Sequence, residues 1–252
     1  MRHDLAFALQ LADLADAITV ERFQADDLVV ETKPDLSPVT EADRAVEQVL
    51  RKRIGEERPG HSVVGEEFGA DRPASARWIL DPIDGTKNYL RGIPVWATLI
   101  ALEREDRVET GVVSAPALHR RWWAARGEGA FVNGRRIGVS KVAELSDALL
   151  SYASLLSWEQ HGLGEQFLTL ARGFWRTRGF GDFWGHMLVA EGAADVAIEP
   201  EVELWDLAAP QVIVEEAGGR FTDLRGTPTP AGRSVVSSNG LLHDRALATL
   251  RP

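Results

Sequence analysis

The stretch Trp78–Leu90, WILDPIDGTKNYL, joins an apolar run to two aspartates and a candidate helix start. Asp81 ends the apolar run, and Asp84 follows three residues later, directly before Gly85. Side chains three apart on a strand point to opposite faces, so both carboxylates converge only if the chain leaves the strand at once. Pro82 and Gly85 permit such a turn. The stretch therefore indicates either a site that gathers two carboxylates or an ordinary Asp-Gly turn with Asp81 as a cap.

Other acidic residues also lie at the ends of apolar elements. Glu66 and Glu67 close the predicted strand in HSVVGEEFG, Asp43 lies in the first turn of a predicted helix, and Asp206 opens the predicted helix DLAAPQVIVEEAGG. Each has a structural explanation: a solvated strand end, a capping box for Asp43 and an N-cap for Asp206. Their shared placement, where α/β proteins build sites, favours one common acidic pocket.

Such a pocket needs positive charge, because burying one uncompensated carboxylate costs several kcal/mol. These motifs contain no Lys or Arg apart from Lys87. A hard divalent cation, which binds oxygen ligands, would neutralise the buried carboxylates, and Mg²⁺ suits such ligands best. Zinc is disfavoured, since the six histidines are scattered and there are no cysteines. Carboxylates holding two or three Mg²⁺ beside a helix N-terminus favour hydrolysis of a phosphate ester by activated water.

The composition limits the class of protein. With 252 residues and 44% hydrophobic residues, the chain can form one large domain or two small ones. Its net charge of −10 makes it a poor partner for nucleic acid. Its apolar runs are shorter than the ~20 residues of a membrane span. Asp4 and Asp13 interrupt any N-terminal signal peptide, so we expect a cytoplasmic enzyme.

The apolar pattern predicts two lobes packed as one domain over residues 1–252. A helix with Leu5 and Leu9 on one stripe and the connection ETKPDLSPVTEAD lead to a second helix over 41–57. Antiparallel strands follow to about residue 140, with Asn133–Gly134 as a hairpin turn. From about 141 to 252, strands and helices alternate. We expect an α/β (α+β) fold whose lobes, about 1–140 and 141–252, are not independent.

Three sequence blocks resemble one known family. DPIDGTKN, the upstream GEE and the downstream WDLAAPQVIVEEAGG are similar to the signature blocks of the inositol-monophosphatase-like Mg²⁺ phosphatases. The resemblance extends from TKPDLSPVTEAD to SSNGLLHD, and three blocks in this order are specific. It implies a layered αβαβα sandwich of the inositol-monophosphatase/fructose-bisphosphatase type, usually a homodimer inhibited by Li⁺, with two or three Mg²⁺ per site.

The resemblance also assigns functions to residues. The implied metal ligands are Glu66, Asp81, the Ile83 carbonyl, Asp84 and Asp206. Asp43 and Thr86 would orient the attacking water, and Glu66 would position it through its metal. The implied phosphate and substrate contacts are Gly85, Thr86, Asn88, Arg178, Asp182, Glu199 and Asp206. Glu67 would support the ligands from behind, and Lys33 would lie near the site.

The substrate side departs from inositol phosphatases. In RGFGDFWGHMLVAEGAAD, Asp182 replaces a small neutral residue of the family and aromatic residues follow it. With Glu199, this acid favours a leaving group that carries an amine and a flat ring, unless Asp182 merely caps the following helix. The pattern resembles the histidinol-phosphate phosphatases of the family. We therefore expect hydrolysis of L-histidinol phosphate to L-histidinol, a step of histidine biosynthesis.

Alternatives follow from the same residues. Inositol-1-phosphate or another small sugar or polyol phosphate could be the substrate. An aspartyl-phosphate mechanism with Asp81 as nucleophile normally uses two acids two apart, whereas Asp81 and Asp84 are three apart. A non-catalytic member of the fold that binds RNA or transcription machinery is disfavoured by the complete ligand set and the acidic balance.

Overall fold

The computed structural model describes residues 2–34 and 38–250. Part of the Pro- and Asp-rich connection, residues 35–37, lies outside the described residues. The α-helices are α1 (Arg2–Arg22), α2 (Glu41–Glu57), α3 (Thr86–Leu90), α4 (Leu155–Gln160), α5 (Gly164–Arg172), α6 (Asp182–Ala190), α7 (Leu204–Glu216) and α8 (His243–Leu250). Two short 3₁₀ helices span Pro116–Leu118 and Leu145–Asp147. None of these helices combines the length and apolar character needed to cross a membrane.

The first sheet has eight strands and is antiparallel except for one pair. Its order is β10 (Arg135–Arg136), β9 (Gly129–Val132), β8 (Arg120–Ala125), β7 (Arg107–Ala115), β6 (Ala97–Arg104), β5 (Ala76–Asp84), β3 (Ser62–Gly65) and β4 (Gly69–Ala70). Only β3 and β5 run parallel. The predicted hairpin turn at Asn133 and Gly134 joins β9 to β10, and both residues have positive φ, as this turn requires.

The second sheet has five strands and is mixed. Its order is β12 (Arg176–Arg178), β11 (Leu149–Tyr152), β13 (Val196–Glu199), β15 (Val235–Ser238) and β14 (Arg220–Thr222). The pairs β12–β11 and β11–β13 are parallel, and the other two are antiparallel. A separate two-stranded ribbon consists of β1 (Val30–Thr32) and β2 (Pro38–Thr40).

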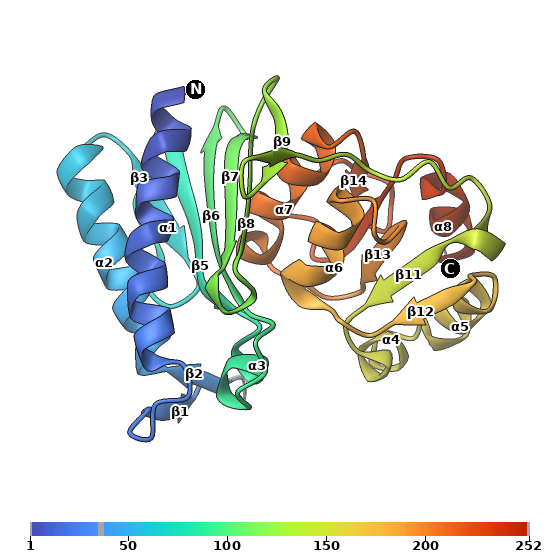
Figure 1. Cartoon of the computed structure of the whole chain (residues 1–252), viewed down its shortest axis with the longest axis horizontal. Coiled ribbons are helices and arrows are strands. Elements are labelled where there is room, and N and C mark those ends of the chain that lie inside the picture. Colours follow the sequence, from blue (N-terminus) through green and yellow to red (C-terminus); the bar gives the residue numbers. More distant parts are fainter. Residues whose placement is uncertain (1, 35–37, 251–252) are drawn as a thin grey trace.

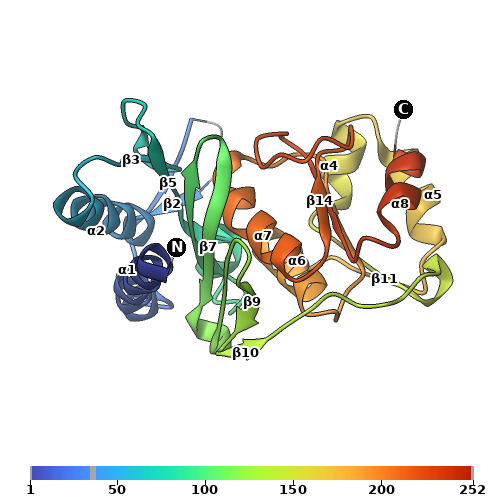
Figure 2. The same ribbon diagram turned by 90° about the horizontal axis from the view of Figure 1, so that it is seen from above.

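Helices and sheets alternate in layers (Figure 1). Helices α1 and α2 cover one face of the first sheet, α6 and α7 lie between the two sheets, and α4, α5 and α8 cover the far face of the second sheet. The view from above shows the same central helices between the sheets (Figure 2). This arrangement confirms the predicted αβαβα sandwich. One core cluster draws residues from both lobes, including Leu99 and Val113 from the first sheet and Met187 and Val212 from α6 and α7.

Strand β5 differs from its prediction at the two aspartates. The strand does not end after Asp81; it continues to Asp84, and Asp81 pairs with Leu99 while Asp84 pairs with Ala97. Three steps on β5 therefore oppose two on β6, which is the geometry of a β-bulge. The extra residue shifts the alternation, so Asp81 and Asp84 reach the same face without leaving the sheet. Pro82 fits this irregular segment because it has no N–H to donate.

Candidate active site

Three carboxylates meet where β5 ends and α7 begins. Asp81, Asp84 and Asp206 each place one oxygen within 4.8 Å of the others. The sequence left open whether Asp206 is a plain N-cap; the N-cap of α7 is instead Glu203. Asp206 lies in the first turn and its Oδ2 accepts from the Glu203 N–H at 2.8 Å. This capping bond fixes the carboxylate at the mouth of the helix, facing the two aspartates of β5.

The cluster is buried and strongly negative. Burial, and then repulsion from Glu66 and Asp84, raises the pKa of Asp81 well above its ordinary value. Burial also raises the pKa of Asp84 well above its ordinary value, with repulsion from Asp182 and Asp206 adding to it. The pKa of Asp206 rises to about 8, chiefly through burial. The carboxylates therefore need either protons or a cation among them.

Unsatisfied oxygens show that this cluster fits a hard cation. Asp81 Oδ1 and Asp43 Oδ1 are both buried and have no hydrogen-bond partner. The capping box expected as an alternative for Asp43 is present, since its Oδ2 accepts from the backbone N–H of Thr40 at 2.8 Å. Only one oxygen of Asp43 is thus used by the cap. Carboxylate oxygens without hydrogen-bond donors are the ligands that Mg²⁺ takes in proteins.

Glu66 lies next to Asp81 but is paired with a lysine. Its backbone N–H donates to Leu80 O on the neighbouring strand at 3.2 Å. Lys33 Nζ lies 2.7 Å from Glu66 Oε1 and 2.6 Å from Glu67 Oε1. Burial raises the pKa of Glu67 to about 7. Burial lowers the pKa of Lys33, but its hydrogen bonds to the two glutamates outweigh this and raise it. Lys33 is thus a counter-charge for Glu66 at the edge of the cluster.

A buried glutamate that the sequence analysis missed holds the turn carrying Glu66. The Glu47 carboxylate on α2 accepts from the N–H groups of Glu67 at 2.7 Å and Phe68 at 3.2 Å, and from Arg51 Nε at 2.7 Å. A Cβ on Gly65 would lie 2.1 Å from Glu47 Oε1, so the close approach requires glycine there. The available signal was an acid on the apolar stripe of the 41–57 helix.

The start of α3 lies beside the carboxylates. Gly85 has φ 82° at its N-cap, and the first hydrogen bonds of the helix run from Asn88 N and Tyr89 N to Gly85 O. The amides of Gly85 and Thr86 precede these donors, where helix N–H groups are free to bind an anion. The Thr86 hydroxyl donates to Ile83 O at 2.9 Å.

A second acidic pair faces the cluster across a pocket of about 150 Å³. The pocket is lined by Asp84, Asp182, His186, Glu199, Glu201, Val202, Asp206 and Leu207. Asp182 is the first residue of α6, with φ 50°, and the N-cap is Gly181. The next N–H of the helix donates to Asp84 Oδ2 at 2.6 Å, so the capping function considered for Asp182 is not observed. Burial raises the pKa of Asp182 to about 7 and that of Glu199 to about 8.

Comparison with known proteins identifies the family. The inositol monophosphatase family matches residues 1–252. The chain belongs to this family. It is 56% identical to a histidinol-phosphatase of Mycobacterium tuberculosis, over 99% of each chain. It is 53% identical to a histidinol-phosphatase of Streptomyces coelicolor, over 98% of this chain and 96% of the other. A solved inositol monophosphatase of Zymomonas mobilis superposes with a TM-score of 0.89 at 32% identity, covering 99% of this chain and 98% of that one.

Family membership makes the chain a phosphoric monoester hydrolase of a metal-dependent family. The structure brings Asp81, Asp84 and Asp206 together, with Glu66 at their edge. Asn88 Nδ2 donates to Val95 O at 2.9 Å and lies 3.5 Å from Asp182 Oδ2. These positions agree with the predicted contacts without testing their functions.

The structure leaves the functions predicted for Asp43, Thr86 and Arg178 untested, and these side chains make the following contacts. The hydroxyl of Thr86 is bonded to Ile83, whereas Asp43 is bonded to Thr40. Arg178 is exposed on the edge strand β12, where its guanidinium donates to Thr177 O at 2.9 Å. It is not among the residues that line the acidic pocket.

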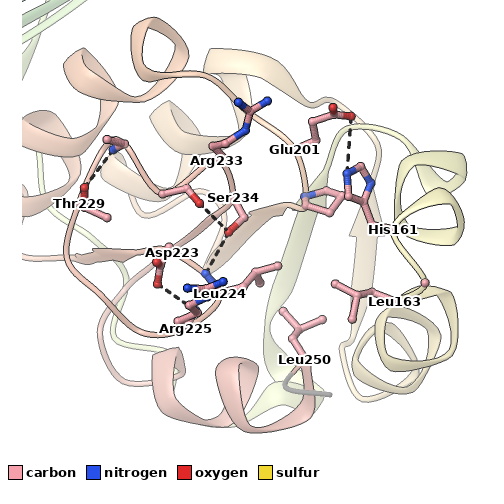
Figure 3. Close-up of a pocket in the computed structure, with 14 residues that line it drawn as sticks. His161, Leu163, Glu201, Asp223, Leu224, Arg225, Thr229, Arg233, Ser234 and Leu250 are labelled. Atoms are coloured by element: carbon pink, nitrogen blue, oxygen red, sulfur yellow. Dashed lines mark hydrogen bonds and ion pairs between the residues drawn. The ribbon is translucent and has the colours of Figure 1, made fainter.

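A larger pocket of about 890 Å³ lies on the C-terminal lobe (Figure 3). Its polar groups are paired with one another: Asp223 Oδ1 accepts from the Arg225 N–H at 2.9 Å, and Ser234 Oγ accepts from the Leu224 N–H at 3.2 Å. Glu201 lines both pockets. Within residues 2–34 and 38–250, the carboxylate group that could hold a metal ion is Asp81, Asp84 and Asp206, and two of these residues line the smaller, acidic pocket rather than the larger one.

Proposed function

We propose that this phosphatase hydrolyses L-histidinol phosphate to L-histidinol and phosphate, a step of histidine biosynthesis. The observation that carries the proposal is the acidic pair of half-buried Asp182 and buried Glu199, which lines the pocket that adjoins Asp84 and Asp206. A neutral polyol would leave these two acids without a cationic partner, whereas the ammonium of histidinol supplies one. The histidinol-phosphatases at more than half identity support the same substrate.

We infer that the metal is Mg²⁺, two or three ions per site, held by Asp81, Asp84 and Asp206 with the Ile83 carbonyl. Glu66 would become a further ligand if its carboxylate left Lys33 and bound the cation instead. When bound there, Mg²⁺ supplies charge that offsets the phosphoryl oxygens and lowers the pKa of water. Glu67 then keeps Lys33 as its partner and supports the ligand turn from behind.

The protein groups around the phosphate orient the reactants. The amides of Gly85 and Thr86 would hold phosphate oxygens at the start of α3. Thr86 Oγ1 donates its proton to Ile83 O, so its lone pairs can accept from a water molecule. The unpartnered Asp43 Oδ1 supplies a second acceptor. These two acceptors would hold both protons of the water and aim its oxygen at phosphorus. That oxygen then forms the new P–O bond as the ester P–O bond breaks, the water gives up one proton to solvent, and the leaving alcohol oxygen takes one up.

On the leaving-group side, Asp182 and Glu199 would bind the ammonium of the alcohol. Asn88 lies beside Asp182 and limits where its carboxylate can turn. We also infer a homodimer from the family resemblance. A cytoplasmic location is proposed from the absence of cysteine and from the biosynthetic histidinol-phosphatase relatives.

Phosphate release from L-histidinol phosphate and from inositol-1-phosphate, each with and without Mg²⁺, tests the proposal. We expect Mg²⁺-dependent release with kcat/KM at least about 10-fold higher for L-histidinol phosphate. Preference for inositol-1-phosphate would assign the chain to the alternative substrate. Absence of turnover on every ester with Mg²⁺ present would favour a non-catalytic member of the fold.

A further inference from the structure

His186 lines the acidic pocket next to Glu199. It is on α6 and is 1% exposed. Its Nε2 lies 3.5 Å from Glu199 Oε1, and its Nδ1 lies 2.8 Å from the hydroxyl of Ser237 on β15. Within residues 2–34 and 38–250, no other side chain is recorded in a hydrogen bond or ion pair with the Glu199 carboxylate.

The contacts of the ring define which nitrogen carries the proton. Burial lowers the pKa of His186 to about 4, so the ring is neutral and has one donor and one acceptor. Ser237 can donate its hydroxyl proton to Nδ1, which leaves the N–H at Nε2. That N–H faces an acidic oxygen, an acceptor whenever Glu199 is ionised. The chain Ser237–His186–Glu199 thus ends in an N–H whose nitrogen lies 3.5 Å from a carboxylate oxygen, an electrostatic contact longer than an ordinary hydrogen bond.

We propose that His186 is a positioning residue for substrate selection: it holds the Glu199 carboxylate toward the pocket, where a cationic leaving group binds. The inference rests on the proposed function, because it assumes that Glu199 contacts the ammonium of the substrate. A glutamate side chain has several rotatable bonds, so a contact that fixes its orientation reduces the entropy lost on binding. Without the Nε2–H, Glu199 stays in the pocket but is no longer held in one direction.

The structure offers a matched control on the same strand. Ser238 follows Ser237 on β15 and points to the opposite face. Its hydroxyl lies 2.8 Å from Nδ1 of His243, which is fully buried and has Thr222 Oγ1 2.9 Å from its Nε2. This second histidine–serine pair has the same local chemistry but ends in a threonine of β14. If His186 only stabilised the fold, as a buried histidine bonded to a serine can, then changing His186 or His243 should have the same effect on activity.

The test compares L-histidinol phosphate with p-nitrophenyl phosphate at saturating Mg²⁺. In His186→Phe, whose ring can pack against Phe221 as the imidazole does, we expect the ratio of the two kcat/KM values to fall about 10-fold, mostly through KM for L-histidinol phosphate. His186→Gln should restore most of the ratio, because its amide N–H can take the place of Nε2–H. His243→Gln should leave the ratio unchanged.

If His186→Phe does not fold, the same kcat/KM ratio can be measured in Ser237→Ala. It removes the hydroxyl that fixes the ring, so the same ratio should fall by about 3-fold. An unchanged ratio in both variants, or an equal fall in His243→Gln, would overturn the positioning function. Failure of the wild-type enzyme to hydrolyse L-histidinol phosphate would instead reject the proposed function, before any variant is measured.

Discussion

Asp84 combines a structural contact with a candidate ligand position. Its Oδ2 accepts from the Phe183 N–H at 2.6 Å, while one of its oxygens faces Asp81 and Asp206. In Asp84→Asn the amide oxygen can keep the contact with Phe183, but the charge is lost. We expect kcat to fall by about 10³-fold or more, since a ligand to the cation is removed. The free energy of unfolding in urea should not decrease, because repulsion within the cluster is relieved. A parallel loss of stability and activity would contradict this assignment.

Asp182 allows a separate test of substrate recognition at the residue scale. Asp182→Asn keeps the shape and the φ of 50° but removes the charge that would bind an ammonium. We expect kcat/KM for L-histidinol phosphate to fall about 10- to 100-fold, and for p-nitrophenyl phosphate less than about 3-fold. Steady-state kinetics on both esters measures this, with the exposed Arg172→Gln on α5 as the control. Equal losses on both esters would show that Asp182 acts without recognising the amine.

At the scale of elements, α2 and the turn after β3 depend on Glu47. Removing its carboxylate leaves the Arg51 guanidinium and the N–H groups of Glu67 and Phe68 without their buried acceptor. We expect Glu47→Leu to lower the free energy of unfolding by about 3–5 kcal/mol. Gln48→Ala, an exposed change on the same helix, should change it by less than about 0.5 kcal/mol. Urea unfolding of both variants decides whether Glu47 holds the turn.

The elements also show what the sequence could predict and what it could not. The first helix, the helix over 41–57, the helix in DLAAPQVIVEEAGG, the Asn133–Gly134 hairpin and the acids at element ends follow from local patterns and turn chemistry. No helix was predicted at α4, Leu155–Gln160. The bulge in β5 depends on how Asp81 and Asp84 pair with β6, which no local pattern specifies. The layered order and the ligand set came from the family resemblance rather than from periodicity.

Residues that act through distant partners were missed for the same reason. Glu47 meets the Glu67 amide across 20 positions, and His186 meets Ser237 across 51. Only the folded chain brings these groups together, so an acid or histidine within an apolar stripe indicates that a buried partner exists without identifying it.

At the scale of the whole molecule, the acidic pocket joins the two lobes. Asp81 and Asp84 come from the first sheet, whereas Asp182, Glu199 and Asp206 come from the central helices and the second sheet. Their mutual repulsion therefore acts directly between the lobes, and a cation that removes it would stabilise the fold as one unit. That the lobes are not independent stays a prediction.

The coupling predicts an effect of metal removal that depends on pH. The pKa of Asp206 is about 8 in the folded chain, against an ordinary value of 3.8, and those of Asp81 and Asp84 are also raised. For an acid whose folded pKa is raised, the contribution to stability is complete below the unfolded pKa and is lost as pH rises toward the folded one. With excess chelator, the carboxylate cluster should therefore make Tm fall as pH rises from about 4 to about 8.

Saturating Mg²⁺ should raise Tm at pH 8 by at least about 3 °C more than at pH 6, since about 1 kcal/mol corresponds to roughly 2–4 °C at this size. Thermal unfolding with Mg²⁺ and with excess chelator measures the difference, and Asp206→Asn should reduce it. Equal Mg²⁺ shifts at both pH values would show that the carboxylates are not the groups that Mg²⁺ neutralises.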